Sequence, residues 1–203
     1  MKIICIGRNY VEHIRELNNA VPTAPVFFLK PDTALLIRNR PFYYPPFSAN
    51  VHHEVELVLK ICKAGKNIQP RFAGNYYDRI GIGFDLTARD LQDEAKSKGL
   101  PWALAKGFDH SAPVSEFLPK EKFTDLKNIR FGLDLNGRTV QEGNSGMMIY
   151  DFDAIISAIS AYMTIRTGDL VFTGTPAGVG PIHTGDLLEA WIEGEKMLRC
   201  QVK

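Results

Sequence analysis

The stretch "HHEVELVLKIC", residues 52–62, predicts a β-strand that carries acids on one side at its start. The alternate residues from Val55 to Ile61 are apolar and share one face, whereas Glu54 and Glu56 share the other. Side chains two residues apart on a strand lie about 7 Å apart, and two carboxylates held there repel each other. By itself the stretch fits two interpretations, a strand edge that faces solvent and one side of a metal site.

A third carboxylate, Asp85, lies at the end of a second predicted strand, residues 79–85. Gly81 and Gly83 in this strand leave room for another group to approach its backbone closely. Three carboxylates without a cysteine partner favour Mg²⁺, Mn²⁺ or Ca²⁺ over zinc, and they leave coordination positions open for water and a chelating substrate. The alternative is that Asp85 only stabilises the positive end of a following helix.

Short helices are predicted in the first half of the chain. One covers about residues 9–18 and ends at Asn18 and Asn19. Another follows the second strand, with Thr87 as its N-cap and Gly99 at its end.

The second half of the chain predicts mainly strands. Asn136 and Gly137 lie between alternating apolar residues, a pattern typical of a type I′ hairpin. Two "TGD" turns, residues 167–169 and 184–186, each precede an apolar strand, and one helix begins at Asp151. Because strands and helices do not alternate regularly, a doubly wound sheet is not expected. We therefore predict an α+β protein that is mainly β, with a few short helices.

Length and composition indicate an ordinary globular chain. Its 203 residues can form one substantial core, so we expect a single domain over residues 1–203. Lys and Arg number 24 against 23 for Asp and Glu, and this balance without a basic run argues against a nucleic-acid partner. No apolar segment is long enough for a membrane span, and the apolar run before Arg8 is too short for a signal peptide. The scattered Cys5, Cys62 and Cys200 suggest buried free thiols, and we predict a cytoplasmic protein.

Six further polar residues are candidates for binding or catalysis. On a helix, a histidine and a glutamate three residues apart share a face and can form a hydrogen bond. The lysine of "PWALAKGFD" has apolar neighbours that favour an inward orientation, and the turn "TGTPAGVG" offers hydroxyl and N–H groups. Each candidate also has an ordinary interpretation, as an exposed polar residue or part of a plain turn. The six residues are Arg8, His13, Glu16, Gln92, Lys106 and Thr175.

Three other patterns do not indicate a site. His52 and His53 are adjacent, so they face opposite sides of a strand, and we leave both out of the metal set. The sequence "GNSGM" around Ser145 lacks the G-x-S-x-G pattern of a serine hydrolase. The "TGTPAGVG" turn is not followed by the Gly-Lys-Ser/Thr of a phosphate-binding loop.

Three long segments together resemble the fumarylacetoacetate hydrolase superfamily: "HHEVELVLKICKAGKNI", "GFDLTARDLQDEAKSKGLPWALAKGFDHSAPVS" and "FTGTPAGVGPIHTGDLLEAWIEG". The segment "GLPWALAKGFD" is similar to the branch of small acylpyruvate hydrolases and oxaloacetate decarboxylases. The resemblance runs from "GRNYVEH" almost to the C-terminus. It implies a mixed β-roll in a homodimer, without the extra N-terminal domain of larger members.

The resemblance also implies roles for the candidate residues. The metal ligands would be Glu54, Glu56 and Asp85, binding Mg²⁺ or Mn²⁺ and in some members Ca²⁺. His13 and Glu16 would lie on a lid, about residues 9–20, where Glu16 orients His13 and His13 takes a proton from water. The other implied residues are Lys106, which would hold an enolate, and the substrate contacts Arg8, Gln92 and Thr175.

The resemblance favours a metal-dependent enzyme acting on a small acidic oxo acid. The first hypothesis is a hydrolase that cleaves the C–C bond of acylpyruvate-type 2,4-dioxo acids to pyruvate and a carboxylate, and that also decarboxylates oxaloacetate. One alternative is an isomerase, tautomerase or decarboxylase of 2-oxo or 2-hydroxy-dienoate dicarboxylic acids. Another, from a different class, is a metal-stabilised domain that binds an acidic metabolite without catalysis.

Overall fold

The structure is a computed structural model that describes residues 1–16 and 20–203. Its largest sheet has six strands, in the order β2-β1-β12-β5-β6-β9. These strands are β1 (Ile3–Ile6), β2 (Phe27–Lys30), β5 (Val55–Ile61), β6 (Tyr77–Phe84), β9 (Leu118–Pro119) and β12 (Leu170–Phe172). A four-stranded sheet has the order β11-β10-β14-β15, with β10 (Arg130–Leu135), β11 (Arg138–Asn144), β14 (Leu187–Ile192) and β15 (Glu195–Gln201).

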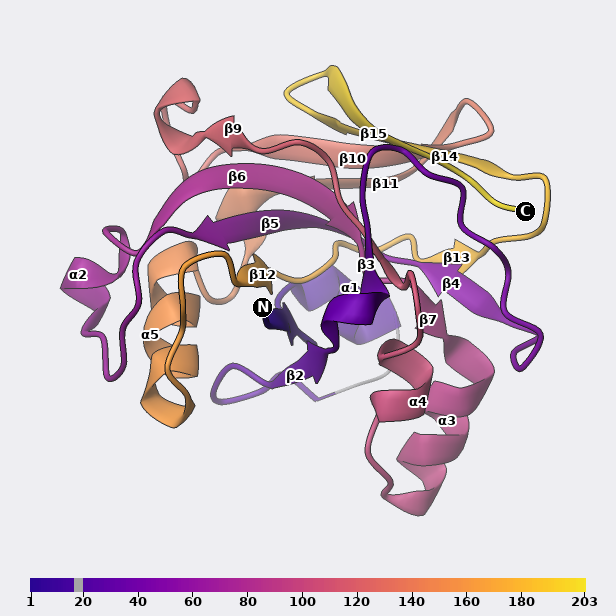
Figure 1. The fold of residues 1–203 in the computed structure, drawn as a ribbon, viewed down its shortest axis with the longest axis horizontal. Helices are drawn as coiled ribbons and strands as arrows, with labels where there is room; N and C mark the ends of the chain where they lie inside the picture. Colours follow the sequence, from indigo (N-terminus) through magenta and orange to yellow (C-terminus); the bar gives the residue numbers. More distant parts are fainter. Residues whose placement is uncertain (17–19) are drawn as a thin grey trace.

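In the described residues, two small sheets, five α-helices and three short 3-10 helices complete the fold, which is α+β and mainly β as predicted (Figure 1). The small sheets contain β4 (Val51–His53), β7 (Thr87–Ala88) and β13 (Gly180–Pro181) in one, and β3 (Leu35–Leu36) and β8 (Ala112–Pro113) in the other. The helices are α1 (Val11–Glu16), α2 (Pro70–Ala73), α3 (Arg89–Lys98), α4 (Ala103–Lys106) and α5 (Phe152–Tyr162). Helices α2 and α5 lie together at one end of the molecule, and α3 and α4 lie together at the other. Among the described residues, no helix combines the length and apolar character needed to cross a bilayer.

Strand β5 separates two apolar clusters, as its alternating sequence predicts. The face with Val55 belongs to the larger cluster, which also contains Phe131 of the four-stranded sheet. The face with Val58 belongs to a smaller cluster with Phe172 of β12. Glu54 and Glu56 lie on the same face as Val58, nearer the start of the strand. Burial of the Val55 face in the larger cluster sets the orientation of β5 and therefore the side to which both glutamates point.

The two glycines of β6 make room for aromatic rings. A Cβ atom on Gly83 would lie 2.8 Å from the ring of Phe172, and one on Gly81 would lie 3.0 Å from the ring of Phe117. The predicted close approach to this strand is therefore made by the packing of the core.

The local turn predictions hold at several places. Asn136 and Gly137 have φ angles of 51° and 78°, the left-handed values that a type I′ turn needs. The Asp151 side chain accepts a hydrogen bond from the backbone N–H of Ala154 and so caps α5. Gly99 ends α3 in the left-handed conformation, with φ 66°.

Two local predictions are wrong. Thr87 does not cap α3, because it lies in β7 and the helix begins at Arg89; its hydroxyl instead donates to the Asp85 carbonyl at 3.0 Å. Cys62 is only partly buried, unlike the other two cysteines, because it lies just past the end of β5. The predicted helix end at Asn18 and Asn19 lies outside the described residues, and α1 covers Val11–Glu16 within them.

Candidate active site

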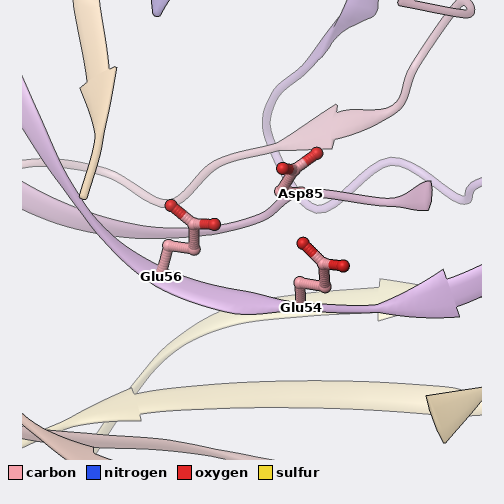
Figure 2. A group of neighbouring side chains, drawn as sticks. All are labelled: Glu54, Glu56 and Asp85. Carbon is pink, nitrogen blue, oxygen red and sulfur yellow. The ribbon is translucent and has the colours of Figure 1, made fainter. Parts of the chain in front are cut away.

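Three acids meet at one end of the largest sheet, where β5 begins and β6 ends (Figure 2). The register pairs Val55 with Phe84, so Glu54 lies opposite Asp85, whose N–H donates to the Glu54 carbonyl at 2.8 Å. Glu56 is two residues along β5 and therefore on the same face as Glu54. One oxygen from each of the three buried acids lies within 4.8 Å of the others.

The ammonium of Lys106 lies between two of these acids. Its Nζ donates to Glu54 Oε2 at 2.8 Å, to Asp85 Oδ2 at 2.7 Å and to Thr87 Oγ1 at 2.6 Å. Lys106 is at the end of α4 and is buried, in the inward orientation that its apolar neighbours suggested. Because its three N–H donors are all used, a substrate oxygen can reach Lys106 only by replacing one of these acceptors.

Two further cations complete the cluster, and sequence reasoning missed both. Lys30 Nζ lies 2.8 Å from Asp85 Oδ1 and donates to the carbonyl of Lys106 at 2.6 Å. Arg89 Nη2 donates to Glu54 Oε1 at 2.5 Å. Neither residue carries a sequence signal, because Lys30 ends a short strand and Arg89 begins a charged helix, where exposed cations are common. Three buried acids are thus accompanied by three buried cations.

The charges around each acid give the two glutamates opposite properties. Burial raises the pKa of Glu56 well above its usual value, and the charges of Asp85 and Glu54 raise it further. Burial also opposes ionisation of Glu54, but Lys106 and Arg89 outweigh this effect and lower the pKa of its carboxyl. The site therefore holds one firmly ionised glutamate and one that favours its neutral form until a cation is near.

The acid cluster has the donor chemistry that Mg²⁺ or Mn²⁺ requires. Glu54, Glu56 and Asp85 supply hard oxygen ligands. The Gly174 N–H donates to Glu56 Oε2 at 2.7 Å and so orients that carboxylate. Among the described side chains, Asp85 Oδ1 is a buried oxygen without an aligned hydrogen bond, although Lys30 is near it. The three acids could therefore hold a divalent metal ion.

The predicted pair on α1 is in contact. His13 is buried, and its Nδ1 lies 3.2 Å from Glu16 Oε2. The other carboxylate oxygen of Glu16 accepts from the Gly178 N–H at 3.0 Å, which ties α1 to the turn after β12. With Nδ1 directed to Glu16, the Nε2 atom of His13 is left for proton transfer.

Asn9 anchors the start of this segment. Its side chain donates to the Thr173 carbonyl at 2.7 Å and to the Tyr150 carbonyl at 3.0 Å, and accepts from the Tyr150 N–H at 2.8 Å. The Tyr150 hydroxyl donates to the Pro22 carbonyl at 2.9 Å, at the far side of the same segment. Tyr150 thus contacts the chain on both sides of α1, at Asn9 before the helix and at Pro22 after it.

A narrow opening reaches the cluster at Glu54, whereas Glu56 and Asp85 are not among its lining residues. It brings together three catalytic candidates from different parts of the chain, the metal ligand Glu54, His13 of α1 and Lys106 of α4. Of the predicted substrate contacts, Arg8 and Gln92 line this opening, whereas Thr175 is not among its lining residues. The other residues that line it are Gly7, Phe28, Arg89, Lys96 and Trp102.

Thr175 instead belongs to a buried network centred on Gln141. The Thr175 hydroxyl accepts from Gln141 Nε2 at 2.9 Å. Gln141 Oε1 lies 2.9 Å from His53 Nδ1 and accepts from the Val55 N–H at 3.0 Å. His53 therefore takes part in this support rather than in the acid cluster, in keeping with its exclusion from the metal set. No motif singled out Gln141 in the sequence, because it lies within an ordinary hairpin strand.

Comparison with known proteins identifies the family. Residues 2–203 match the family described as Fumarylacetoacetate (FAA) hydrolase C-terminal. The chain belongs to the fumarylacetoacetate hydrolase family. It is 44% identical over 201 residues to the mitochondrial oxaloacetate tautomerase of Bos taurus, a match that covers 99% of this chain and 91% of the relative.

Two further relatives bear on the chemistry of the family. The chain is 42% identical to the mitochondrial oxaloacetate decarboxylase of Dictyostelium discoideum, over 95% of this chain and 89% of the relative. It is 33% identical to the fumarylpyruvate hydrolase of Pseudomonas aeruginosa, whose crystal structure contains Mn²⁺ and pyruvate. That structure superposes with a TM-score of 0.94 and covers 100% of this chain and 89% of the relative. The chain is therefore a fumarylacetoacetate hydrolase family enzyme of the branch that contains oxaloacetate tautomerases and decarboxylases.

Proposed function

We propose that the protein is a metal-dependent enzyme that forms and protonates enolates of 2-oxo acids, with oxaloacetate tautomerisation as its principal reaction. One observation carries this proposal. A buried ammonium, Lys106 Nζ, lies within 3 Å of two acids of the proposed metal site and lines the same opening as a buried histidine. Relatives named as oxaloacetate tautomerases support the choice of substrate.

Each group has a defined task in this reaction. A Mg²⁺ or Mn²⁺ ion held by Glu54, Glu56 and Asp85 would act as a Lewis acid toward the substrate. His13 Nε2 accepts the proton from C3, and the C–H electron pair forms the C2–C3 double bond while the carbonyl π pair moves to oxygen. Lys106 holds this enolate oxygen by charge and by a hydrogen bond that replaces one of its three present acceptors. Return of the proton to oxygen gives the enol, and the reverse sequence gives the keto form.

The contact between His13 and Glu16 favours hydrolysis of acylpyruvates as a second candidate function. An imidazole whose Nδ1 faces a carboxylate is a suitable base for activating water. Water would add to the 4-carbonyl, the C3–C4 bond would break, and a carboxylate and the pyruvate enolate would leave. Because both reactions pass through an enolate beside Lys106, one site can support them. A domain that only binds a metabolite would have no use for a buried histidine at this opening.

A side-by-side assay tests the proposal. EDTA-treated protein is supplied with Mg²⁺ and given enolic oxaloacetate, and the keto form is captured with malate dehydrogenase while pyruvate is measured with lactate dehydrogenase. We expect faster keto formation with little pyruvate, and loss of the effect when EDTA is retained. Pyruvate as the main product would indicate a decarboxylase, and faster loss of acetylpyruvate would favour the hydrolase. Inert behaviour toward both substrates with Mg²⁺ and with Mn²⁺ would refute enolate chemistry.

The homodimer, the single domain over residues 1–203 and the cytoplasmic location stay predictions. Size-exclusion chromatography with light scattering would test the first of these directly.

A further inference from the structure

Helix α3 presents a positively charged face to the opening. Arg89, Gln92 and Lys96 follow one another at spacings of three and four residues, so they share a face, and all three line the opening. Lys96 is about 10 Å along the helix from Arg89. Because helical side chains lean toward the N-terminus, Lys96 covers the turn that carries Gln92. Arg8, from the loop after β1, lines the same opening.

The cations at this opening differ in how their charge is balanced. Lys106 is ion-paired with Glu54 and Asp85, and Arg89 is ion-paired with Glu54. Within the described part of the chain, the ion pairs include none with Lys96.

The surroundings of Lys96 disfavour its charge in the free protein. Burial, Arg89 and Arg8 lower the pKa of the half-buried Lys96 ammonium, with partial compensation from Asp93 and Glu54. Cations that repel one another at a partly buried place are stabilised when an anion binds between them. The position of Lys96 thus favours an anionic group of a bound ligand.

A 2-oxo dicarboxylate carries an anionic group at each end, and this opening offers cations both at the acid cluster and on α3. Its 2-oxo carboxylate end would lie at the acid cluster, beside Lys106 and Arg89. Its second carboxylate would then extend outward along the opening, toward the outer turns of α3. We infer that Lys96, together with Arg8, binds this second carboxylate and that Lys96 determines a preference for dicarboxylates over 2-oxo monocarboxylates. The inference rests on the proposed function and names the substrate class of the same site.

Binding of D-malate and D-lactate to the Mg²⁺-loaded protein, measured by isothermal titration calorimetry, tests the inference. The two acids differ only by the second carboxylate, and neither undergoes tautomerisation or decarboxylation. We expect wild-type protein to bind malate roughly tenfold or more tightly than lactate, as for one charge-assisted hydrogen bond. In Lys96→Met the malate affinity should fall most of the way toward that of lactate, since only Arg8 remains for the second carboxylate, while the lactate affinity stays unchanged. Lys96→Arg should keep most of the preference.

Lys98→Met is the matched control, because Lys98 lies on the same helix but pairs with Glu94 at the surface. It should bind both acids like wild type. Equal affinities in wild type, or absence of binding of either acid, would overturn the inference. So would a Lys96→Met protein that loses malate and lactate alike, provided its melting temperature matches wild type. If malate is preferred through Lys96 but oxaloacetate is not converted, the carboxylate site stands and the proposed reaction is wrong.

Discussion

The acid cluster and helix α1 contribute to the same opening, but they are built in different ways. The cluster stands on paired strands, and its acids and cations hold one another through buried contacts of 2.5–2.8 Å. Helix α1 has six residues, and its His13–Glu16 pair is tied to the neighbouring turn by a hydrogen bond to Gly178. The acids are thus held by the strands and by their buried ion pairs with cations of β2, α3 and α4, whereas the proton-transfer pair is attached more lightly. Changes in the cluster should therefore affect stability and activity together, and changes in α1 should affect activity alone.

The largest effect is expected for Lys106→Met. It removes the cation shared by Glu54 and Asp85, so that Glu54 keeps only Arg89 and Asp85 keeps only Lys30 among the buried cations of the cluster. Breaking a buried ion pair typically costs about 3–5 kcal/mol. The substitution also removes the donor for the enolate, so kcat should fall by about 10²–10³. Thermal melting with EDTA and with Mg²⁺ checks the first part. The loss should be larger with EDTA, because a bound divalent ion replaces the missing positive charge.

Lys98→Met is the control here as well, since the ammonium of Lys98 is exposed and pairs with Glu94 at the surface. Its melting temperature should stay close to that of wild type. A Lys106→Met protein that melts like this control would show that the buried ion pairs do not stabilise the cluster.

The next largest effect should come from His13→Gln. Removing a general base lowers rates by about 10²–10⁴, so we expect at least a hundredfold loss of kcat for enolic oxaloacetate. The free energy of unfolding should change by less than about 1 kcal/mol, because in the described part of the chain His13 is paired with Glu16 of its own helix and forms no ion pair with the three acids. Mg²⁺ affinity, from calorimetry, should be unchanged. Full activity in this variant would remove His13 from the mechanism.

His183→Gln serves as the matched control. This histidine is exposed, pairs with Asp186 and is not among the residues that line the opening. It should retain wild-type rates. Comparable losses in both variants would indicate a general effect on folding and not on proton transfer.

Glu56→Gln tests whether the pKa of Glu56 is raised, so that its carboxyl group is neutral in the metal-free protein. Its pKa is raised by burial and by Asp85 and Glu54, so the stability due to the neutral form is present below the ordinary value near 4.5 and is lost as pH rises through the raised value. In EDTA, wild type should therefore melt at lower temperature at pH 8 than at pH 5, and Glu56→Gln should reduce this difference. Each kcal/mol corresponds to about 2–4 °C for a chain of this size.

The same variant should lose the melting shift produced by Mg²⁺, since it lacks one ligand of the proposed site. Glu12→Gln is a suitable control because Glu12 is exposed and pairs with Arg15 on α1. A Glu56→Gln protein that is less stable than wild type in EDTA at pH 8 would contradict the raised pKa.

The sequence predicts local features of the fold better than contacts between distant segments. Local patterns were sufficient for the hairpin at Asn136 and Gly137 and for the cap at Asp151, because both depend on neighbouring residues. The common face of Glu54 and Glu56 follows from the strand period. Their meeting with Asp85 depends on strand register, which no local pattern predicts; the family resemblance implied only that the three acids act together.

The missing part consists of contacts between distant segments. Lys30 reaches Asp85 across 55 positions of the chain, and at the end of its strand it looks like any solvated lysine. Thr87 was misjudged as a cap because the pairing of β4 with β7 holds it in a strand before α3 begins. Buried polar partners of this kind are set by the tertiary fold, so a single sequence gives no periodic signal for them.

The smallest effect is expected for Glu16→Gln, which separates the two tasks of this side chain. The amide oxygen can still accept from the Gly178 N–H, so α1 should stay attached. The negative charge beside His13 Nδ1 is lost, however, and the imidazolium formed during proton transfer is no longer stabilised. We expect roughly a tenfold fall in kcat with little change in KM, a cost of about 1.4 kcal/mol in the transition state. Steady-state kinetics beside Glu12→Gln would check this, and a rise in KM without a fall in kcat would mean that Glu16 serves only to hold α1 in place.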